Sequence, residues 1–229
     1  MTTTPAPPPS LPTTSYAILG MLALRPWSAY DLTQQLRRSL DYCWPTAESV
    51  LYQEPKRLVR LGLATAKRQA AGRRGRTVYT IAEQGRARLA EWLATQPRPP
   101  RLEVEAMLRL LYADQGGKQD LLEAVRATRA WALERAPQGL AQVDGYLADG
   151  GPFPERLHII ALFSRFYLDL FELIVGWADL AEAEVAAWPG TGDLGMTEQT
   201  RALLEELRPR LAALAARADR SEGHGPAGA

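Results

Sequence analysis

Apolar positions recur at helical spacing along most of the chain, and the first of them form a nearly continuous block. This block, SYAILGMLAL at residues 15–24, is far shorter than the roughly 20 residues of a membrane span and predicts a buried helix. Pro26 follows it, and Ser28 is then a candidate N-cap for a second helix that reaches about Leu40. The apolar side of the second helix is predicted to consist of Tyr30, Leu32, Leu36 and Leu40.

A third helix is predicted from Thr46, whose hydroxyl can cap the first turn, to Gly62, which favours a left-handed helix end. One side of this helix is apolar and is expected to face the core: Val50, Leu51, Leu58 and Leu61. The other side is rich in groups that form hydrogen bonds: Glu48, Ser49, Tyr52, Gln53, Lys56 and Arg60. So many such groups indicate a face that binds a partner as well as water.

The segment after this helix, residues 64–81, predicts a β-hairpin with a long basic loop. Its second half, TVYTI, is β-branched and aromatic, as in a strand, and its loop is AAGRRGR. Five cations without an acid among them lie close together here: Lys67, Arg68, Arg73, Arg74 and Arg76. A basic hairpin alone is more often a solvated turn. Beside a polar helix that two helices precede, it fits the wing of a winged helix-turn-helix, which contacts a phosphate backbone.

The rest of the pattern is helical and predicts a second domain. A fourth helix at about 82–94 has Leu89, Trp92 and Leu93 on its apolar side, and the proline-rich residues 96–101 form a linker. Further helices are expected at about 102–112, 119–136, 155–180 and 197–216, with Pro137 stopping or bending one of them. We therefore predict a mainly α protein. It has a winged helix-turn-helix domain with a β-hairpin wing at 15–95, an all-helical dimerisation domain at 102–220, and disordered tails at 1–14 and 221–229.

The segment 155–180 is apolar on two sides, so both sides have to be covered. We expect the chain's own helices on one side and a second copy on the other. The residues predicted for the dimer interface are Leu157, Ile160, Tyr167, Phe171, Ile174 and Trp177. The second stripe consists of Ile159, Leu162, Phe166, Leu170, Leu173 and, again, Trp177. The last helix carries Leu204, Leu207, Leu211 and Leu214 at three- and four-residue spacing, with Pro209 expected to bend it.

Charge divides the chain as the helices do. Residues 1–95 hold 13 Lys and Arg against 6 Asp and Glu, whereas residues 96–229 hold 14 against 20, so a basic half precedes an acidic one. This asymmetry indicates a module for a polyanion joined to one with another task. One cysteine, Cys43, excludes a disulfide framework, and residues 1–14 have no apolar block typical of a secretion signal. We expect a cytoplasmic protein without a membrane partner.

Side chains for catalysis are sparse. The two histidines are His158, in the apolar helical segment, and His224, in the tail, and neither has the spacing of a zinc site. No glycine-rich phosphate loop follows a predicted strand. We therefore predict no enzyme, no metal and no cofactor. Aromatic residues of the second domain could line a pocket for a flat apolar ligand, although ordinary core packing explains them more simply: Trp131, Phe166 and Trp177.

Residues 15–93 resemble the PadR family of bacterial transcriptional regulators. The resemblance lies in SYAILGMLALRPWSAYDL, in LYQEPKRLVRLGL, and in the basic hairpin that closes on VYTIAEQGRARLAEWL. It implies that Tyr52, Lys56 and Arg57 belong to the recognition helix, that residues 64–81 are the wing, and that the long carboxyl-terminal region forms a homodimer. Three residues depart from the family pattern: Ala29 replaces a common glycine, Pro55 interrupts the recognition helix, and Ala82 lacks a capping hydroxyl.

These observations predict a homodimeric regulator that binds double-stranded DNA at a pseudo-palindromic operator. Base edges are assigned to Ser49, Gln53 and Lys56, and backbone contacts to Tyr52, Arg57, Arg60, Arg73, Arg74 and Arg76. The expected action is that of a repressor released by a small hydrophobic or aromatic effector. The alternative is a winged-helix module whose basic surface binds an acidic protein partner.

Overall fold

The structure is a computed structural model that describes residues 11–40, 44–69, 75–192 and 194–222. The chain forms two compact units, Met1–Pro100 and Arg101–Ala229. The predicted tails lie mostly outside the described residues. Two residues assigned to the first tail, Thr13 and Thr14, instead form the start of a helix, and Ser221 and Glu222 are the last residues of another.

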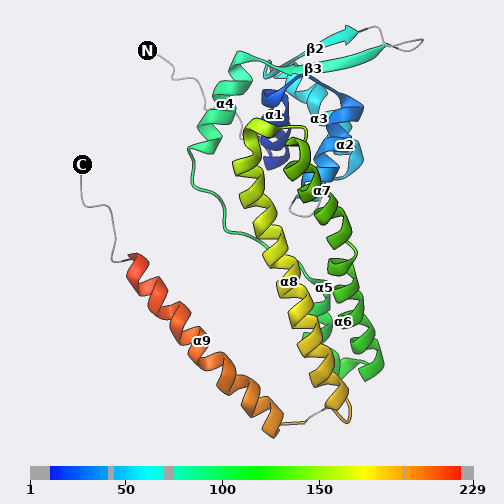
Figure 1. The fold of residues 1–229 in the computed structure, drawn as a ribbon, viewed down its shortest axis with the longest axis vertical. Helices are drawn as coiled ribbons and strands as arrows, with labels where there is room; N and C mark the ends of the chain where they lie inside the picture. Colours follow the sequence, from blue (N-terminus) through cyan, green and yellow to red (C-terminus); the bar gives the residue numbers. More distant parts are fainter. Residues whose placement is uncertain (1–10, 41–43, 70–74, 193, 223–229) are drawn as a thin grey trace, which may run out of the picture. The chain divides into compact units, whose positions relative to one another are not determined.

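The first unit consists of four helices and a small sheet among its described residues (Figure 1). Their order along the chain is α1 (Thr13–Leu24), β1 (Trp27–Ser28), α2 (Ala29–Leu40), α3 (Glu48–Arg60), β2 (Ala64–Gln69), β3 (Arg76–Ile81) and α4 (Glu83–Leu93). The strands pair antiparallel in the order β1-β3-β2, with Trp27 opposite Tyr79 and Ala64 opposite Ile81. The winged helix-turn-helix predicted from the sequence is confirmed by this arrangement.

The core of the first unit is formed by side chains from α1, α2, α3 and the three strands, and Gly85 is the buried residue of α4. Its most deeply buried apolar residues are Ile18, Leu19 and Leu22 of α1, Leu32 of α2 and Leu58 of α3. The Ser28 cap is confirmed, because the Asp31 amide donates to the Ser28 hydroxyl at 3.1 Å and α2 starts at the next residue. Ring stacking joins α1 to α4, with the centroids of Tyr16 and Trp92 4.7 Å apart.

Four residues predicted for apolar faces are in fact exposed in this unit. Leu93 is 68% exposed, Tyr30 is 62% exposed, and Val50 and Leu61 are both 42% exposed. Each lies near one end of its helix, where neighbouring elements no longer cover the apolar side. The buried side of α3 is formed instead by Leu51, Glu54, Pro55 and Leu58.

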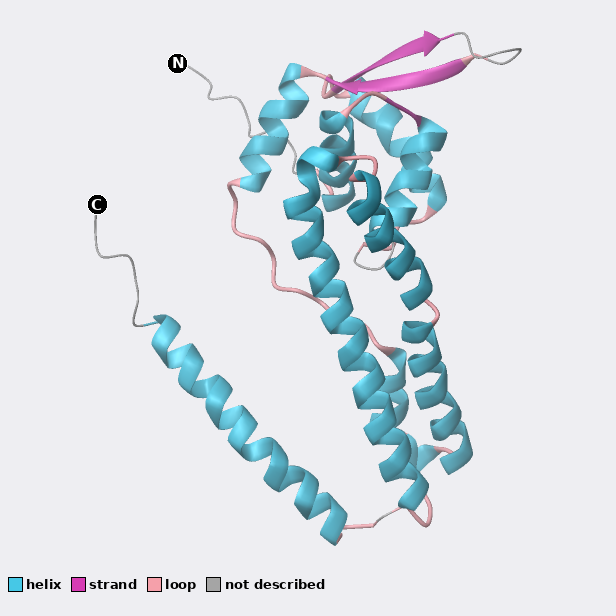
Figure 2. Cartoon of the chain, viewed as in Figure 1, coloured by secondary structure: helices cyan, strands magenta, loops and turns pink. Residues whose placement is uncertain are grey.

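The second unit is helical throughout its described part, as the absence of strands after residue 81 in Figure 2 illustrates. Its elements are α5 (Glu105–Leu111), a 3-10 turn (Ala113–Gln115), α6 (Lys118–Leu133), α7 (Ala136–Asp149), a 3-10 turn (Pro154–Arg156), α8 (Leu157–Ala187) and α9 (Glu198–Glu222). Pro137 occupies the first turn of α7, which confirms that it separates two helices. The segment predicted at 155–180 is the longest helix, with 31 residues.

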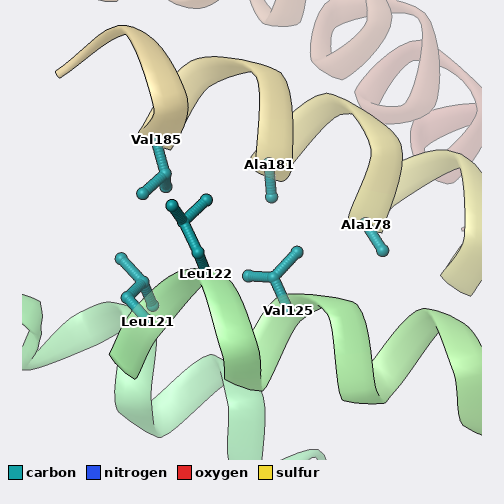
Figure 3. Packing of buried hydrophobic residues seen from close by; sticks show 6 residues of the cluster. All are labelled: Leu121, Leu122, Val125, Ala178, Ala181 and Val185. Atoms are coloured by element: carbon teal, nitrogen blue, oxygen red, sulfur yellow. The ribbon is translucent and has the colours of Figure 1, made fainter. Parts of the chain in front are cut away.

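Helices α6 and α8 pack along one another at the carboxyl-terminal end of α8. Figure 3 shows Leu122 and Val125 of α6 pointing toward small residues of α8, Ala178 and Ala181. Because alanines leave room for the facing side chains, the two helices can approach closely. Charge supports the same contact, since Arg126 and Arg129 of α6 pair with Glu182 of α8 at 2.6 and 2.8 Å.

Helix α9 is almost wholly exposed. The four leucines predicted for its apolar side, Leu204, Leu207, Leu211 and Leu214, are all exposed, and Pro209 lies inside a helix that continues without interruption. A helix with exposed leucines at this spacing lacks a cover for its apolar side. None of the described helices is long and apolar enough to cross a membrane.

Candidate nucleic-acid interface

Helix α3 is the central element of the candidate interface, and its two ends are built differently. At its start the N-cap is Ala47, which has no capping side chain, and the Thr46 hydroxyl donates instead to the Trp44 carbonyl at 3.1 Å. The predicted Thr46 cap is therefore wrong. At its end the prediction is confirmed: Gly62 has a φ of +72°, and its amide donates to the Val59 carbonyl at 3.0 Å. The Leu63 amide reaches the Leu58 carbonyl at 2.9 Å, which completes a Schellman motif.

Four polar side chains lie together on the exposed side of α3. Ser49, Gln53, Lys56 and Arg60 are all exposed, and at 100° per residue they fall within an arc of about 60°. Two of these residues carry a positive charge and the other two carry neutral hydrogen-bonding groups, the combination that reads base edges beside phosphates. Tyr52 is half-buried at the margin of this arc.

Arg57 lies at the other margin of the arc and turns toward the protein. Its guanidinium Nη1 lies 2.8 Å from Oε1 of Glu54 and 3.5 Å from the hydroxyl of Ser15 on α1. Glu54 is 9% exposed and accepts a short hydrogen bond from Ser15, which is fully buried. The sequence assigned Arg57 to the DNA backbone and did not single out Ser15 or Glu54. The one signal for this cluster was a carboxylate three residues before an arginine, the spacing of a helical ion pair.

Pro55 does not divide α3. The helix continues from Glu48 to Arg60, although Pro55 cannot donate a hydrogen bond to the carbonyl of Leu51. A proline at this position is expected either to kink the helix or to divide it into two turns, and the division is therefore wrong. The Pro55 ring is fully buried, so packing supports the helix where its hydrogen bonding is weakened.

The hairpin formed by β2 and β3 presents its cations to solvent. Lys67, Arg68 and Arg76 are exposed, and the register places Lys67 opposite Val78 and Arg68 opposite Thr77. Nη1 of Arg76 lies 3.8 Å from a carboxylate oxygen of Asp31, a loose contact at the surface. The predicted contact residues Arg73 and Arg74 lie outside the described residues. Tyr79 lies on β3, the second strand of the hairpin, and its burial raises its pKa.

The two ends of the hairpin are joined at the carbonyl of Leu63. This carbonyl accepts a hydrogen bond from the Ala82 amide at 3.0 Å, just before α4. As predicted, Ala82 provides no side-chain cap for that helix. The same carbonyl approaches Gly85 so closely that a Cβ there would lie 2.1 Å from the oxygen. Glycine at position 85 therefore permits a contact that any other residue would block.

The residues predicted for the dimer interface occupy the inner side of α8. Tyr167 is buried, and the other five are half-buried against other side chains of the same unit: Leu157, Ile160, Phe171, Ile174 and Trp177. Phe171, for example, lies edge-on to Trp131 of α6 with 5.7 Å between ring centroids. The neighbouring stripe is open, with Ile159, Leu162, Phe166 and Leu173 all exposed.

The three aromatic residues predicted to bind a ligand lie in different surroundings. Trp131 is partly covered by Arg135, whose guanidinium carbon lies 4.1 Å from the ring centroid, whereas Phe166 is exposed and Trp177 packs near the α6–α8 contact. A wide open depression lies elsewhere, between α5 and the start of α6, beside Leu108, Tyr112 and Leu121.

Metal-binding clusters are absent from the described residues. No three His, Cys, Asp or Glu side chains there are placed to hold an ion. His158 is exposed at the start of α8, and both Cys43 and His224 lie outside the described residues.

Comparisons with known proteins identify the first unit. Residues 18–91 match the transcriptional regulator PadR-like family. The negative transcriptional regulator PadR of Bacillus subtilis (strain 168) is 31% identical over 107 residues, which are 46% of this chain and 59% of that relative. The chain therefore spans less than two thirds of the length of this relative.

Solved structures extend the likeness to both units as a matter of fold. Bacillus subtilis PadR in complex with operator DNA covers 76% of this chain and 99% of its own, with a TM-score of 0.65 and 22% identity. The same protein in complex with p-coumaric acid gives a TM-score of 0.57 at 22% identity, covering 76% of this chain and 96% of its own. The likeness to the PadR-like family of transcriptional regulators is thus one of sequence over residues 18–91 and one of fold over most of the chain.

Proposed function

We propose that this protein is a homodimeric transcriptional regulator that binds a pseudo-palindromic operator in double-stranded DNA. The observation that carries the proposal is the exposed polar arc of α3, which is followed after three residues by a hairpin with exposed cations. A helix of this kind fits the major groove, and the hairpin beside it meets the phosphate backbone. The helix supplies sequence readout and the hairpin supplies salt-dependent affinity.

Residue roles follow from position on α3 and on the hairpin. Ser49, Gln53 and Lys56 lie on the exposed arc and would contact base edges. Arg60 at the end of α3, Tyr52 at the margin of the arc, and Arg76 on β3 would contact the backbone. Arg73 and Arg74 remain backbone candidates from the sequence alone.

The second unit would hold two copies together. Its support is the uncovered apolar surface of α8 and α9, because large exposed apolar patches on one chain are typical of interfaces. A two-fold interface would present two α3 helices to half-sites about one helical turn apart. We place the centre of this interface on the open stripe of α8, with Leu162 and Phe166 among its residues. The inner stripe, which includes Tyr167, would hold α8 in place by packing inside the unit.

Repression, with release by an effector, completes the proposal. The Bacillus relative is named a negative regulator, and a structure of it contains p-coumaric acid, a small aromatic acid. In this chain the aromatic residues between α6 and α8 would belong to such a site, with Trp131 and Trp177 among them. An effector would act by binding one arrangement of the two DNA-reading helices more tightly than the other.

The test is a titration of a fluorescent duplex that carries the promoter-proximal DNA of the protein's own gene, at several salt concentrations. We expect tight binding that weakens steeply with salt, and weaker binding to a scrambled duplex. Gln53→Ala should weaken binding to the promoter duplex about tenfold, roughly the loss of one base contact, and change binding to the scrambled duplex little.

A matched control separates the interface from overall charge. Arg60→Gln and Arg109→Gln each remove one exposed arginine from a helix, on α3 and on α5 respectively. The first should reduce the salt dependence, and the second should leave it unchanged. Absence of binding to any duplex at low salt would contradict the proposal and favour the acidic protein partner as ligand of the same surface.

A further inference from the structure

The cluster of Ser15, Glu54 and Arg57 is an ionic group that connects α3 to the core of the first unit. Oε1 of Glu54 accepts hydrogen bonds both from the Ser15 hydroxyl and from Nη1 of Arg57, the latter at 2.8 Å. The Glu54 side chain is 11% exposed and the Arg57 side chain is 35% exposed. A carboxylate at this depth requires a partner, and the two groups that satisfy it come from α1 and α3.

The position of Arg57 separates it from the other cations of α3. Lys56 and Arg60 lie on the exposed arc, whereas Arg57 lies about 70° from its centre, on the side that faces α1. Its guanidinium also lies 3.5 Å from the hydroxyl of Ser15, a residue with no exposed surface. Together Glu54 and Arg57 carry no net charge, so the pair has little charge with which to displace counterions from DNA.

We propose that Glu54 keeps Arg57 out of the DNA interface and, through Ser15, fixes the rotation of α3 about its own axis. This inference rests on the proposed DNA-binding function. Glu54 and Ser15 are then positioning residues, which set which side chains of α3 face the groove. Ser49, Gln53, Lys56 and Arg60 are selected for that face because Arg57 is held back.

The decisive measurement is the slope of log affinity against log salt for the promoter duplex. Arg60→Gln should make the slope shallower by about 0.9 for each phosphate that loses its cation, whereas Arg57→Gln should leave it unchanged. Glu54→Gln removes the charge that neutralises Arg57, so the slope should become steeper by a similar amount. Arg57→Gln in the Glu54→Gln background should cancel this increase.

Ser15→Ala tests the positioning role separately from charge. It leaves both members of the ion pair in place, so the salt slope should not change. The preference for the promoter duplex over the scrambled one should fall, by about tenfold, because α3 is less firmly oriented. A purely structural role for Ser15 would lower thermal stability while both affinities changed in parallel, and that result would overturn the positioning role.

Urea unfolding tests the Glu54–Arg57 pair in the absence of DNA. Glu54→Gln, Arg57→Gln and the double variant should shift the unfolding midpoint non-additively, because each single change removes the same pair. Additive shifts would overturn the pairing. A shallower salt slope in Arg57→Gln, or an unchanged slope in Glu54→Gln, would contradict the proposal that Glu54 keeps Arg57 out of the DNA interface. Either result would leave the proposed DNA binding itself intact. If the wild type bound no duplex, both the proposed function and the proposed role of Glu54 in DNA binding would fail. Non-additive shifts of the unfolding midpoint would still establish the Glu54–Arg57 pair.

Discussion

The two units differ in how completely each encloses its own apolar side chains. In the first unit, which we call the winged unit, buried side chains come from α1, α2, α3 and all three strands. In the helical unit, the well-buried cluster lies at one end, where Val125 of α6 meets Ala178 and Ala181 of α8. Toward its other end α8 exposes Leu162 by 76% and Phe166 by 64%. The winged unit thus encloses most of its apolar side chains, whereas the second, helical unit leaves a large apolar surface uncovered.

This difference gives each unit its own expected behaviour. A complete core should fold and persist alone, because burial of apolar surface is the main favourable term in folding. An open apolar surface gains the same free energy only when a partner covers it. Removing or altering parts of each unit therefore tests the contrast directly.

The largest effect is expected from separating the units. A fragment that ends at residue 100 should fold as a monomer and bind the promoter duplex about 10²- to 10⁴-fold more weakly than the whole chain, because two linked half-site contacts become one. Light scattering would give its mass and the duplex titration its affinity. A fragment that is dimeric and binds as tightly as the whole chain would disprove the assignment of dimerisation to the second unit.

A charge on the open stripe of α8 should have the next largest effect. Phe166→Glu should raise the dimer dissociation constant about 100-fold, since a carboxylate without a partner would enter an apolar interface. Leu168→Glu is the matched control, because Leu168 is 52% exposed on the opposite side of the helix. Sedimentation at several protein concentrations would measure both. Equal effects would mean that the interface lies elsewhere on the unit.

The closed core of the winged unit is tested by two glycines. Gly85→Ala should lower the free energy of unfolding by about 2 kcal/mol, because its Cβ would lie 2.1 Å from the Leu63 carbonyl and would force the backbone apart. Gly20→Ala, in the middle of α1, meets nothing within 4 Å and should stabilise by up to about 1 kcal/mol. Urea unfolding followed by circular dichroism measures both. Similar losses in the two variants would argue against close packing at Gly85.

The smallest effect concerns pH and the helical unit. The hydrogen bond from Arg126 is the main cause that holds the pKa of Glu182 below its usual range, with the charges of Arg126 and Arg129 acting the same way. The stabilisation is therefore present at neutral pH and is lost as pH falls through the lowered pKa. Glu182→Gln should lower the unfolding midpoint slightly at pH 7 and leave it unchanged in strong acid. Glu184→Gln removes a charge two residues later, on the opposite side of α8, and its effect on the unfolding midpoint should not depend on pH in this way.

The winged unit could be predicted in detail because its signals are local. The Ser28 cap, the left-handed Gly62 and the β-branched run at residues 77–81 each fix one boundary through chemistry within a few residues. Errors arose where one of several possible contacts decides the outcome. The Thr46 hydroxyl donates to the Trp44 carbonyl two residues earlier and does not cap α3, and Pro55 remains in a helix because its ring is buried by tertiary contacts.

The Ser15, Glu54 and Arg57 cluster shows the same limit at the candidate interface. Helical periodicity places Arg57 near the polar face, yet a serine 42 residues earlier in the chain helps to turn it inward. The sequence of the helical unit left a similar choice open. Its two apolar stripes were both visible in the spacing, but spacing alone does not tell which stripe α6 covers.

The shared carbonyl of Leu63 has a mechanical consequence. Because it receives the Ala82 amide and abuts Gly85, the end of α3 and the start of α4 are locked together at the root of the hairpin. A rotation of α4 would therefore also move the end of α3 and the start of β2. The chain leaves the winged unit just beyond α4, so residues 94–100 are the segment through which a force from the second unit would reach these elements.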